Sequence, residues 1–487
     1  MTEPVSPELL ARVDALFRDR VSAGIAPSSV WGVFDHGGLV ASGGHGDRGD
    51  GSPPDADTVY RIASCTKSVT AAAVMLLVER GQLDLDAPIT DFVPAFRAVR
   101  LPTPDAPVPT VRMLLTMSGG FPTDDPWADR QESLSDDAFD AVLRAGILFD
   151  AVPGTRFAYS NLGYALLGRV VAVVSGRPYV DVARTEVLEA VGLPATTFSA
   201  ADSPGFVVRG VRPHDAGWEP LPLTGPGAFS SIGGLFSTVT DLSRWARHLS
   251  AAFVTPDATP TGGAPSSGGP VTTQGRRQMQ QAMRIIPGPG PRPMGYGFGL
   301  FVEEDPRVGP IVSHSGGYPG FSAHMRWSTS TGLGVVAFEN ATAARVALAA
   351  TEAHDLLLAG SASPEVPEAT LPVTLAAQGA VTRFLAEWCR DDAPGDPATD
   401  GAASAVLAPN VAMDVPLDRR RAAVRVAVDV AGAVVTDPPD TTWSESPTHL
   451  GWRIAGTRGV LRVEIRLAPL RVGLVQTLVV RAEPSAD

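Results

Sequence analysis

Apolar residues recur at two different spacings along the chain, and these predict a mixture of helices and strands. Between residues 7 and 21 they recur every three or four positions, the period of an amphipathic helix. Other segments are short and rich in β-branched residues, as strands are. Helices are expected at 7–21, 66–79, 133–149, 162–175, 237–249 (capped by Thr240), 343–358 and 374–390. Strands are expected at 30–34 and 39–42, as a hairpin, and at 296–303, 311–314, 321–327 and 333–338.

Segments rich in proline, glycine and serine divide the chain into two predicted domains. The first, residues 1–360, mixes strands and helices and is expected to be an α/β core with a helical insertion. A linker is expected at 361–372. The second domain, residues 373–487, contains alternating segments at 424–430, 460–467 and 474–481, which predict a small antiparallel β domain. Residues 255–270 hold no core-forming side chains and are predicted to be a flexible insertion.

Composition excludes several classes of protein. Apolar residues make up 44% and charged residues 19%, so the chain can build a large core. The net charge of −13, without a basic face, argues against nucleic-acid binding, and Arg419–Arg421 is interpreted as a solvated turn. No apolar run reaches the roughly 18 residues of a membrane span, and the acidic N-terminal segment predicts a cytoplasmic location. The two cysteines, Cys65 and Cys389, imply no disulfide framework.

Lysine is almost absent, and the position of the single lysine is informative. Of 39 basic residues, 38 are arginine and one is Lys67, in the segment Ser64-Cys-Thr-Lys67. At the start of a helix this spacing places the amine on the same face as the Ser64 hydroxyl. A serine nucleophile needs a base, and a buried lysine can lose its proton where arginine cannot. We therefore predict that Ser64 is a nucleophile and Lys67 its base.

Two further segments carry polar groups suited to this chemistry. Tyr159 and Asn161 open a helix; a tyrosine near a lysine can pass a proton, and an asparagine amide can hold a carbonyl. Taken alone, they would be interpreted as a core tyrosine and a capping asparagine. His314-Ser315-Gly316-Gly317 ends a predicted strand, where glycines allow a substrate to approach the backbone. Alone, His314 would be interpreted as a half-buried, hydrogen-bonded histidine.

Together, in this order, the three segments resemble the serine β-lactamase and penicillin-binding-protein superfamily, and most of all its class C β-lactamase, D,D-peptidase and esterase branch. The resemblance covers roughly residues 8–360. It is supported by the segments 60–67, 114–120, 153–161 and 231–238. It implies a catalytic domain with an antiparallel sheet flanked by helices and a helical subdomain.

The resemblance also implies residue roles. Ser64 would be acylated and Lys67 would be its general base, while Tyr159 would relay a proton and Asn161 would position a substrate amide. The backbone amides of Ser64 and Gly317 would form an oxyanion hole. The family often has Lys-Thr-Gly where this chain has His314-Ser315-Gly316, so a fixed cation for a substrate carboxylate is missing and efficient β-lactamase activity is not expected.

The substrate is less constrained, and three alternatives stay open. The layout resembles stand-alone penicillin-binding-protein-type thioesterases, which take a peptide from a carrier-protein thioester and cyclise it, and which carry a lipocalin-like β domain. The alternative is a cytoplasmic esterase or D-amino-acid peptidase acting on small esters or amides. A third is a penicillin-recognising homologue without turnover. No metal or organic cofactor, nucleic acid or membrane partner is implied.

Other patterns fail on their context. Residues 44–49 match G-x-G-x-x-G, but no helix can follow, so a dinucleotide site is excluded. Cys65 is expected to pack in the core. Asp124-Asp125 and Asp136-Asp137 are interpreted as solvated loop and helix-cap residues.

Overall fold

The computed structural model describes residues 5–215, 217–254, 269–288, 290, 292–360, 370–389, 397–433, 435 and 441–484. The chain divides into two compact units, residues 1–362 and 363–487, at a point inside the predicted linker. Most of the predicted insertion at 255–270, and most of that linker, lie outside the described residues. Among the described residues, no helix has both the length and the apolar character needed to cross a lipid bilayer.

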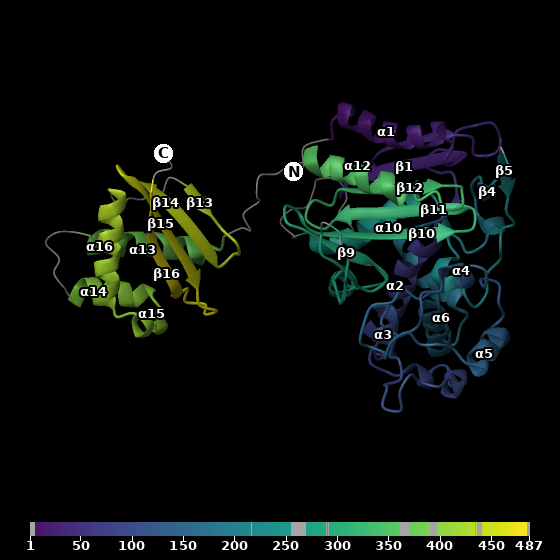
Figure 1. The fold of residues 1–487 in the computed structure, drawn as a ribbon, viewed down its shortest axis with the longest axis horizontal. Coiled ribbons are helices and arrows are strands. Elements are labelled where there is room, and N and C mark those ends of the chain that lie inside the picture. The colour runs from purple at the N-terminus through teal and green to yellow at the C-terminus, as the bar shows by residue number, and fades with distance from the viewer. Residues whose placement is uncertain are drawn as a thin grey trace. The chain divides into compact units, whose positions relative to one another are not determined.

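The first unit is built on an eight-stranded sheet in the order β2-β1-β12-β11-β10-β9-β8-β7, and every pairing in it is antiparallel (Figure 1). This confirms the predicted antiparallel sheet. Its strands are β1 Ser28–Phe34, β2 Leu39–Gly46, β7 Arg284–Ile286, β8 Met294–Tyr296, β9 Phe301–Asp305, β10 Gly309–Tyr318, β11 Phe321–Ser328 and β12 Gly334–Glu339. Two short pairs lie apart from it: β3 Tyr60–Arg61 with β6 Phe236–Ser237, and β4 Val211–His214 with β5 Gly217–Pro220.

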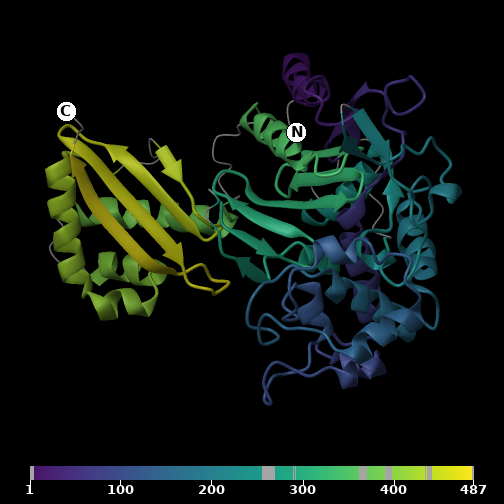
Figure 2. The same ribbon diagram turned by 45° about the vertical axis from the view of Figure 1, so that its right-hand side comes forward.

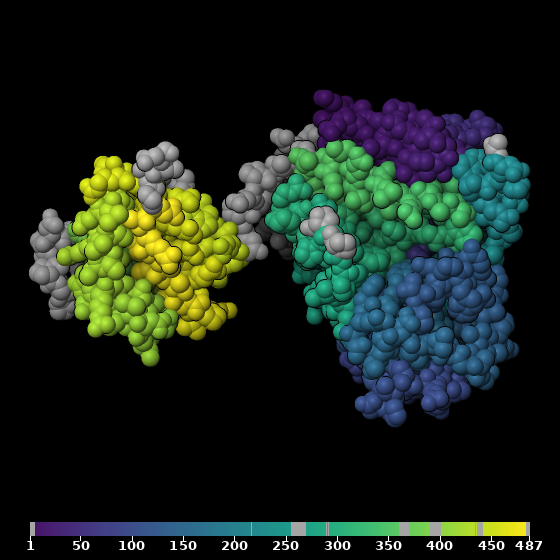
Figure 3. All heavy atoms as spheres, viewed as in Figure 1, coloured from purple at the N-terminus to yellow at the C-terminus, as the bar shows by residue number. Residues whose placement is uncertain are grey.

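Helices cover both faces of this sheet. Alternate residues of β1 point to opposite sides, with Trp31 and Val33 in one buried cluster and Val30 and Phe34 in the other. The first cluster is closed by α1 (Pro7–Ser22) and α12 (Ala347–Gly360), which lie side by side on the outside of the unit (Figures 1 and 3). The second is closed by α2 (Thr66–Glu79) and α10 (Val239–Ser250).

Most of the remaining helices form the predicted helical subdomain. They are α3 Val111–Leu115, α4 Asp125–Ala128, α5 Asp136–Ala145, α6 Asn161–Ser175, α7 Tyr179–Val182, α8 Glu189–Val191 and α9 Ser230–Gly233. Helix α11, Thr273–Met279, instead contacts α2 and the turn that follows α10. Helix α2 is buried from Thr66 to Leu77, because the sheet lies on one side of it and α6 on another. A helix that is apolar all round has to be buried in this way.

Two local predictions were wrong. The strand predicted at 296–303 is two strands, β8 and β9, separated by a turn in which Gly299 has φ +73°. A Cβ on Gly299 would lie 2.5 Å from the backbone oxygen of Lys67, so the chain needs glycine there. Helix α10 is capped by Thr238, whose hydroxyl accepts from the Asp241 amide at 3.1 Å, and not by Thr240.

The second unit contains an antiparallel sheet of four strands and several helices (Figure 2). The strands are β13 Thr441–Trp443, β14 His449–Ala455, β15 Gly459–Leu467 and β16 Val475–Pro484, and the helices are α13 Pro372–Trp388, α14 Pro397–Val406, α15 Pro409–Asp414 and α16 Leu417–Ala431. The predicted antiparallel strands at 460–467 and 474–481 are confirmed. The described residues form an open sheet beside helices, however, and not the lipocalin-like β domain that the resemblance implied.

The segment 424–430 was predicted as a strand and is helical. Its buried residues, Arg421, Val424, Val428 and Ala431, recur at three- and four-residue spacing, while Val426 and Val430 are exposed. The valines at every second position suggested a strand, but the buried positions follow the spacing of a helix. Arg419–Arg421, interpreted as a solvated turn, forms the first turns of the same helix, and Arg421 is buried.

Candidate active site

Ser64 lies where a short strand becomes a buried helix. It is the middle residue of a single 3₁₀ turn, Ala63–Cys65, between β3 and α2. Ala63 has φ +46°, a left-handed conformation that is costly for a residue with a Cβ. Ser64 is 7% exposed, so its hydroxyl is shielded from bulk solvent and still borders a cavity. Cys65 packs in the core as predicted, and its thiol donates to the His314 carbonyl.

Lys67 is completely buried and has three hydrogen-bond partners. Its Nζ lies 2.9 Å from Ser64 Oγ, 2.6 Å from Asn161 Oδ1 and 2.8 Å from the Ile232 carbonyl oxygen. Asn161 Oδ1 and the Ile232 carbonyl oxygen can only accept a hydrogen bond, whereas a serine hydroxyl can donate or accept. A neutral amine has two hydrogens and one lone pair. It would donate to the two carbonyl oxygens and direct its lone pair at the Ser64 hydroxyl, as a base must.

The surroundings of Lys67 favour loss of its proton. Burial lowers the pKa of Lys67 to about 8, although the carboxylates of Asp129, Asp125 and Asp124 oppose part of that shift. The same burial raises the pKa of Asp129. A fraction of Lys67 is therefore neutral near neutral pH. A general base works best when its pKa lies near the working pH in this way.

The reactivity of Ser64 is expected to depend on pH through Lys67. Because only the neutral amine can accept a proton, labelling of Ser64 by a fluorophosphonate should rise with pH and level off above about pH 8. Below that pH the rate should fall about tenfold per unit. Asp129→Asn removes a charge that favours protonated Lys67, so it should move the rise to lower pH. A labelling rate that is flat between pH 6 and pH 9 would exclude Lys67 as the base.

Tyr159 lies over the same two residues. The ring centroid of Tyr159 is 5.1 Å from Lys67 Nζ, and its hydroxyl interacts with the Ser64 side chain. Burial, with the negative charge of Asp125 next, raises the pKa of Tyr159 well above its usual value. The phenol therefore stays protonated and is suited to donate a proton, while Lys67 is suited to accept one.

Asn161 has a different environment from the one predicted. Its side chain is fully buried; its Oδ1 accepts from Lys67, and its Nδ2 donates to Asp125 Oδ1 at 2.6 Å. Both ends of the amide are thus occupied by protein groups. Asp124 holds the start of this helix by accepting from the backbone amides of Asn161 and Leu162 at 2.7 and 2.8 Å. The contacts of Asn161 favour orientation of Lys67 over binding of a substrate amide.

His314 is buried and neutral. Its Nε2 lies 3.1 Å from the Tyr296 hydroxyl and its Nδ1 lies 2.6 Å from the Ser315 carbonyl oxygen. Burial, followed by the charge of Lys67, lowers the pKa of His314 to about 3. The segment His314–Gly317 therefore presents no positive charge at neutral pH, as expected from the absence of a lysine in it.

The two glycines of this segment have different surroundings. Strand β9 pairs with β10 only as far as Ser313, so residues 314–318 lie beyond that pairing, and His314, Ser315 and Gly317 line the same cavity as Ser64. A Cβ on Gly316 would lie 2.2 Å from the Ile62 backbone oxygen, so this glycine serves close packing against the protein and not against a substrate. Gly317 lines the cavity with Ser64, where both backbone amides were predicted to form an oxyanion hole.

These side chains surround one cavity of about 390 Å³. It is lined by Ser64, Asp125, Asp129, Phe157, Tyr159, Phe301, His314, Ser315 and Gly317. None of these lining residues is lysine or arginine, and three are aromatic. Within the described part of the chain, no group of three or more His, Cys, Asp or Glu side chains is arranged to hold a metal ion.

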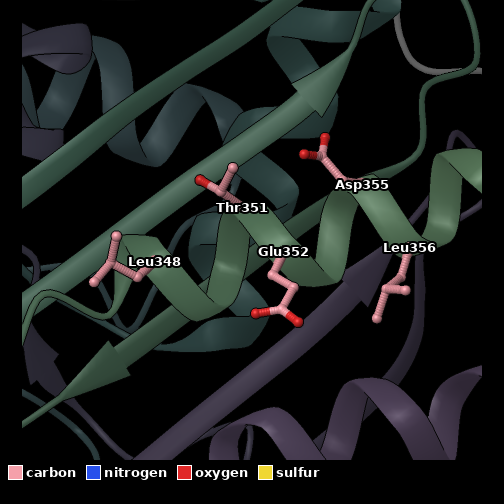
Figure 4. Close-up of a pocket in the computed structure, with 5 residues that line it drawn as sticks. All are labelled: Leu348, Thr351, Glu352, Asp355 and Leu356. Atoms are coloured by element: carbon pink, nitrogen blue, oxygen red, sulfur yellow. The ribbon is translucent and has the colours of Figure 1, made fainter. Parts of the chain in front are cut away.

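A second hollow, of about 450 Å³, lies along the outer face of α12 (Figure 4). It is lined by Leu348, Thr351, Glu352, Asp355 and Leu356 of that helix alone. It contains none of the predicted site residues.

Sequence reasoning missed the acidic loop beside the cavity. Asp124 and Asp125 were interpreted as solvated loop residues. Asp125 is indeed exposed, but its carboxylate accepts from Asn161 Nδ2, Asp124 accepts from the Asn161 amide at the start of α6, and Asp129 lines the cavity. Asp136 and Asp137 do lie in the first turn of α5, where the macrodipole favours acids. The signal available for the loop was three acids beside a proline and a tryptophan, a composition that solvated loops share.

A buried ion pair lies next to the segments that carry Ser64 and Gly317. Arg61 and Glu132 form a salt bridge with side chains 1% and 2% exposed. Glu132 also accepts from Thr224 at 2.6 Å and from the Tyr318 hydroxyl at 3.1 Å, and the Arg61 guanidinium lies 3.8 Å from the Tyr318 ring centroid. Arg61 precedes Ser64 by three residues and Tyr318 follows Gly317, so the pair joins both sides of the predicted oxyanion hole.

Comparison with known proteins gives a consistent result. The sequence matches the Beta-lactamase family over residues 13–359. It is 31% identical to Esterase EstB from Burkholderia gladioli, over 48% of this chain and 69% of EstB. It is 28% identical to the D-alanyl-D-alanine-carboxypeptidase/endopeptidase AmpH from Escherichia coli (strain K12), over 42% of this chain and 52% of AmpH, so it spans about half of that relative.

Among solved structures, the fold resembles the octameric penicillin-binding protein homologue from Pyrococcus abyssi. The TM-score is 0.59 at 20% identity, and the match covers 94% of this chain and 96% of that one. The sequence match to the family spans nearly all of the first unit and includes every residue of the cavity described above. The chain therefore belongs to the beta-lactamase family of serine hydrolases.

Proposed function

We propose that this protein hydrolyses esters or amides whose acyl group carries no carboxylate, as an esterase or D-amino-acid peptidase does. The observation that carries the proposal is the charge of the cavity. Among the described residues that line it, the ionisable ones are Asp125, Asp129, the protonated Tyr159 and the neutral His314, and none is arginine or lysine. An anionic acyl group would face the acidic side chains of Asp125 and Asp129 with no counter-charge among the lining residues, whereas a neutral or cationic group would not be repelled.

The proposed reaction proceeds through an acyl-enzyme. Lys67 takes the proton of the Ser64 hydroxyl as Oγ attacks the carbonyl carbon, and the Ser64 and Gly317 amides receive the developing oxyanion. Tyr159 donates a proton to the leaving group as its bond to the acyl carbon breaks, and it is returned to neutrality by the proton held on Lys67. Water then attacks the acyl-enzyme by the same route in reverse.

The relatives support ester and amide chemistry but differ in substrate. One is an esterase, and another is named for cleavage beside D-alanine. The absence of a cation in the cavity supports the esterase more than a carboxypeptidase, since the latter must bind a free C-terminal carboxylate. The three aromatic side chains of the lining, Phe157, Tyr159 and Phe301, suit an apolar acyl group.

A second candidate is transfer of a peptidyl thioester to an amine of the same peptide, which would make the protein a macrocyclising thioesterase served by a peptidyl carrier protein. One observation favours it: Asp125 and Asp129 border the cavity and would attract a terminal ammonium. The raised pKa of Asp129 also lets it accept a proton from that amine near neutral pH. Water and amine differ only as acceptors, so the two candidates share the acylation step.

A matched series of p-nitrophenyl esters tests the charge preference. The D-alanyl ester (cationic), its N-acetyl form (neutral) and its N-succinyl form (anionic) share one reacting centre. The kcat/KM of the first two should exceed that of the third by at least about tenfold, from one like-charge interaction at a partly solvated site. Asp129→Asn should reduce the difference. Equal turnover of the succinyl ester would contradict the proposal.

The acceptor is tested separately. Incubation with a peptidyl thioester that ends in a D-residue should give a cyclic product if the protein is a cyclase. A hydrolysed product alone would exclude the thioesterase cyclase and leave the esterase.

A further inference from the structure

Ser315 connects the catalytic cavity to a buried histidine on the neighbouring strand. Ser315 of β10 lines the cavity, and its Oγ lies 2.9 Å from Nδ1 of His324 on β11. The two residues are direct cross-strand partners in the antiparallel register. Directly opposite side chains in such a pair are neighbours on one face of the sheet, so the contact is fixed by the fold itself.

The contact with Ser315 is the only hydrogen bond of the His324 side chain among the described residues. His324 is 4% exposed, and its other ring nitrogen, Nε2, has no partner in the described part of the chain. Its neighbours include Arg326, which is itself buried and paired with Glu303 at 2.9 Å. Burial and then the charge of Arg326 lower the pKa of His324 well below its usual value, so the imidazole stays neutral.

His324 destabilises the folded state more than an apolar residue would at the same position. A buried polar atom without a partner destabilises the folded state, whereas an apolar side chain of the same size would not. The other residues of β11 with the same orientation include Ser322 and Arg326, and each of these has its own polar partner. His324 keeps one nitrogen without a partner among the described residues while its other nitrogen contacts the hydroxyl of Ser315, a residue that lines the same cavity as Ser64.

We propose that His324 is a positioning residue for the reaction, whose imidazole holds the Ser315 hydroxyl in a single orientation at the wall of the catalytic cavity. This inference rests on the proposed function, since it takes the cavity to be the acylation site. A free serine hydroxyl samples several rotamers, whereas one hydrogen bond to a rigid, buried ring selects one of them. The remaining hydrogen-bonding capacity of Ser315 then faces the bound acyl group, one residue before the start of the Gly316-Gly317 pair.

The test is a double-mutant cycle on the full chain with the N-acetyl-D-alanyl ester as substrate. Ser315→Ala and His324→Phe should each lower kcat/KM by about fivefold to tenfold, the effect of one hydrogen bond. The double variant should be no slower than Ser315→Ala alone, because His324 acts through Ser315. Additive losses, with His324→Phe equally harmful in both backgrounds, would overturn the proposal and assign His324 to packing.

A matched pair of polar variants keeps the test decisive if His324→Phe does not fold. His324→Asn places an amide near the position of Nδ1 and should keep most of the activity, whereas His324→Gln extends its amide towards the position of Nε2 and should lose it. Both variants disturb the core similarly, so equal losses would contradict the proposal. Failure of the wild-type protein to turn over any of the esters would instead contradict the proposed function.

Discussion

Replacing Lys67 by arginine is expected to abolish acylation of Ser64, with a loss of about 10³-fold or more in kcat/KM. The substitution keeps a positive charge and a long side chain. It removes the ability to accept a proton, because a guanidinium is not deprotonated in proteins. The Lys67 amine lies 2.9 Å from Ser64 Oγ and has two further carbonyl acceptors, so a charge alone would satisfy those contacts but could not activate the serine.

The measurement is the rate of Ser64 labelling by a fluorophosphonate, followed by mass spectrometry at fixed pH. Thermal unfolding of the variant should be recorded beside it, since arginine is larger than lysine in a fully buried site. Arg112→Lys, on an exposed pair with Asp86, is a control that exchanges the same two residue types and should leave the rate unchanged. A Lys67→Arg variant that folds and labels at close to the wild-type rate would place the base elsewhere.

Replacing Glu132 by glutamine is expected to destabilise the protein by about 3 kcal/mol. The substitution keeps the volume and removes the charge that faces Arg61, leaving a buried guanidinium without its counter-ion. The amide oxygen of the glutamine can still accept a hydrogen bond from Thr224 or Tyr318, so the expected loss comes from the missing charge. Because this pair joins Arg61, near Ser64, to Tyr318, beside Gly317, kcat should fall as well as stability.

The measurement is denaturant unfolding of the wild type and the variant under identical conditions. Asp86→Asn is the matched control. It also replaces a carboxylate paired with arginine, but the Arg112 and Asp86 side chains are 40% and 62% exposed. Such a surface pair contributes about 1 kcal/mol or less. Equal effects of the two substitutions would show that the Arg61–Glu132 pair does not stabilise the fold in the way proposed.

The proximity of Ser64 and Lys67 was easier to predict than the surroundings of this pair. Ser64 and Lys67 are three residues apart on one helix, so local geometry alone brings them together. Their contacts with Asn161 and Tyr159 depend on the fold, and the sequence assigned these two residues to the same site only through the resemblance. The roles of Asp124, Asp125 and Asp129 could not be predicted, because a loop's acids become functional only when the loop folds against the start of another helix.

The second unit shows the same limit at the level of secondary structure. In 424–430, valine at every second position suggested a strand, but the burial of Val424 and Val428 and the exposure of Val426 follow a helix. Whether residues 424–430 form a helix or a strand depends on which of their side chains pack against the sheet, and that is decided by the tertiary structure. Segments 460–467 and 474–481 have the same alternation and are strands, because their partners in the sheet bury one face.

Acylation of Ser64 with Lys67 as its base is tested most directly by quenching the reaction with the N-acetyl-D-alanyl ester in acid and measuring the mass of the intact protein and of its peptides. We expect one acyl group on the peptide that contains Ser64, absent in Ser64→Ala and lost in Lys67→Arg. Turnover of the ester without an adduct on Ser64, or an adduct that persists in Ser64→Ala, would contradict this mechanism.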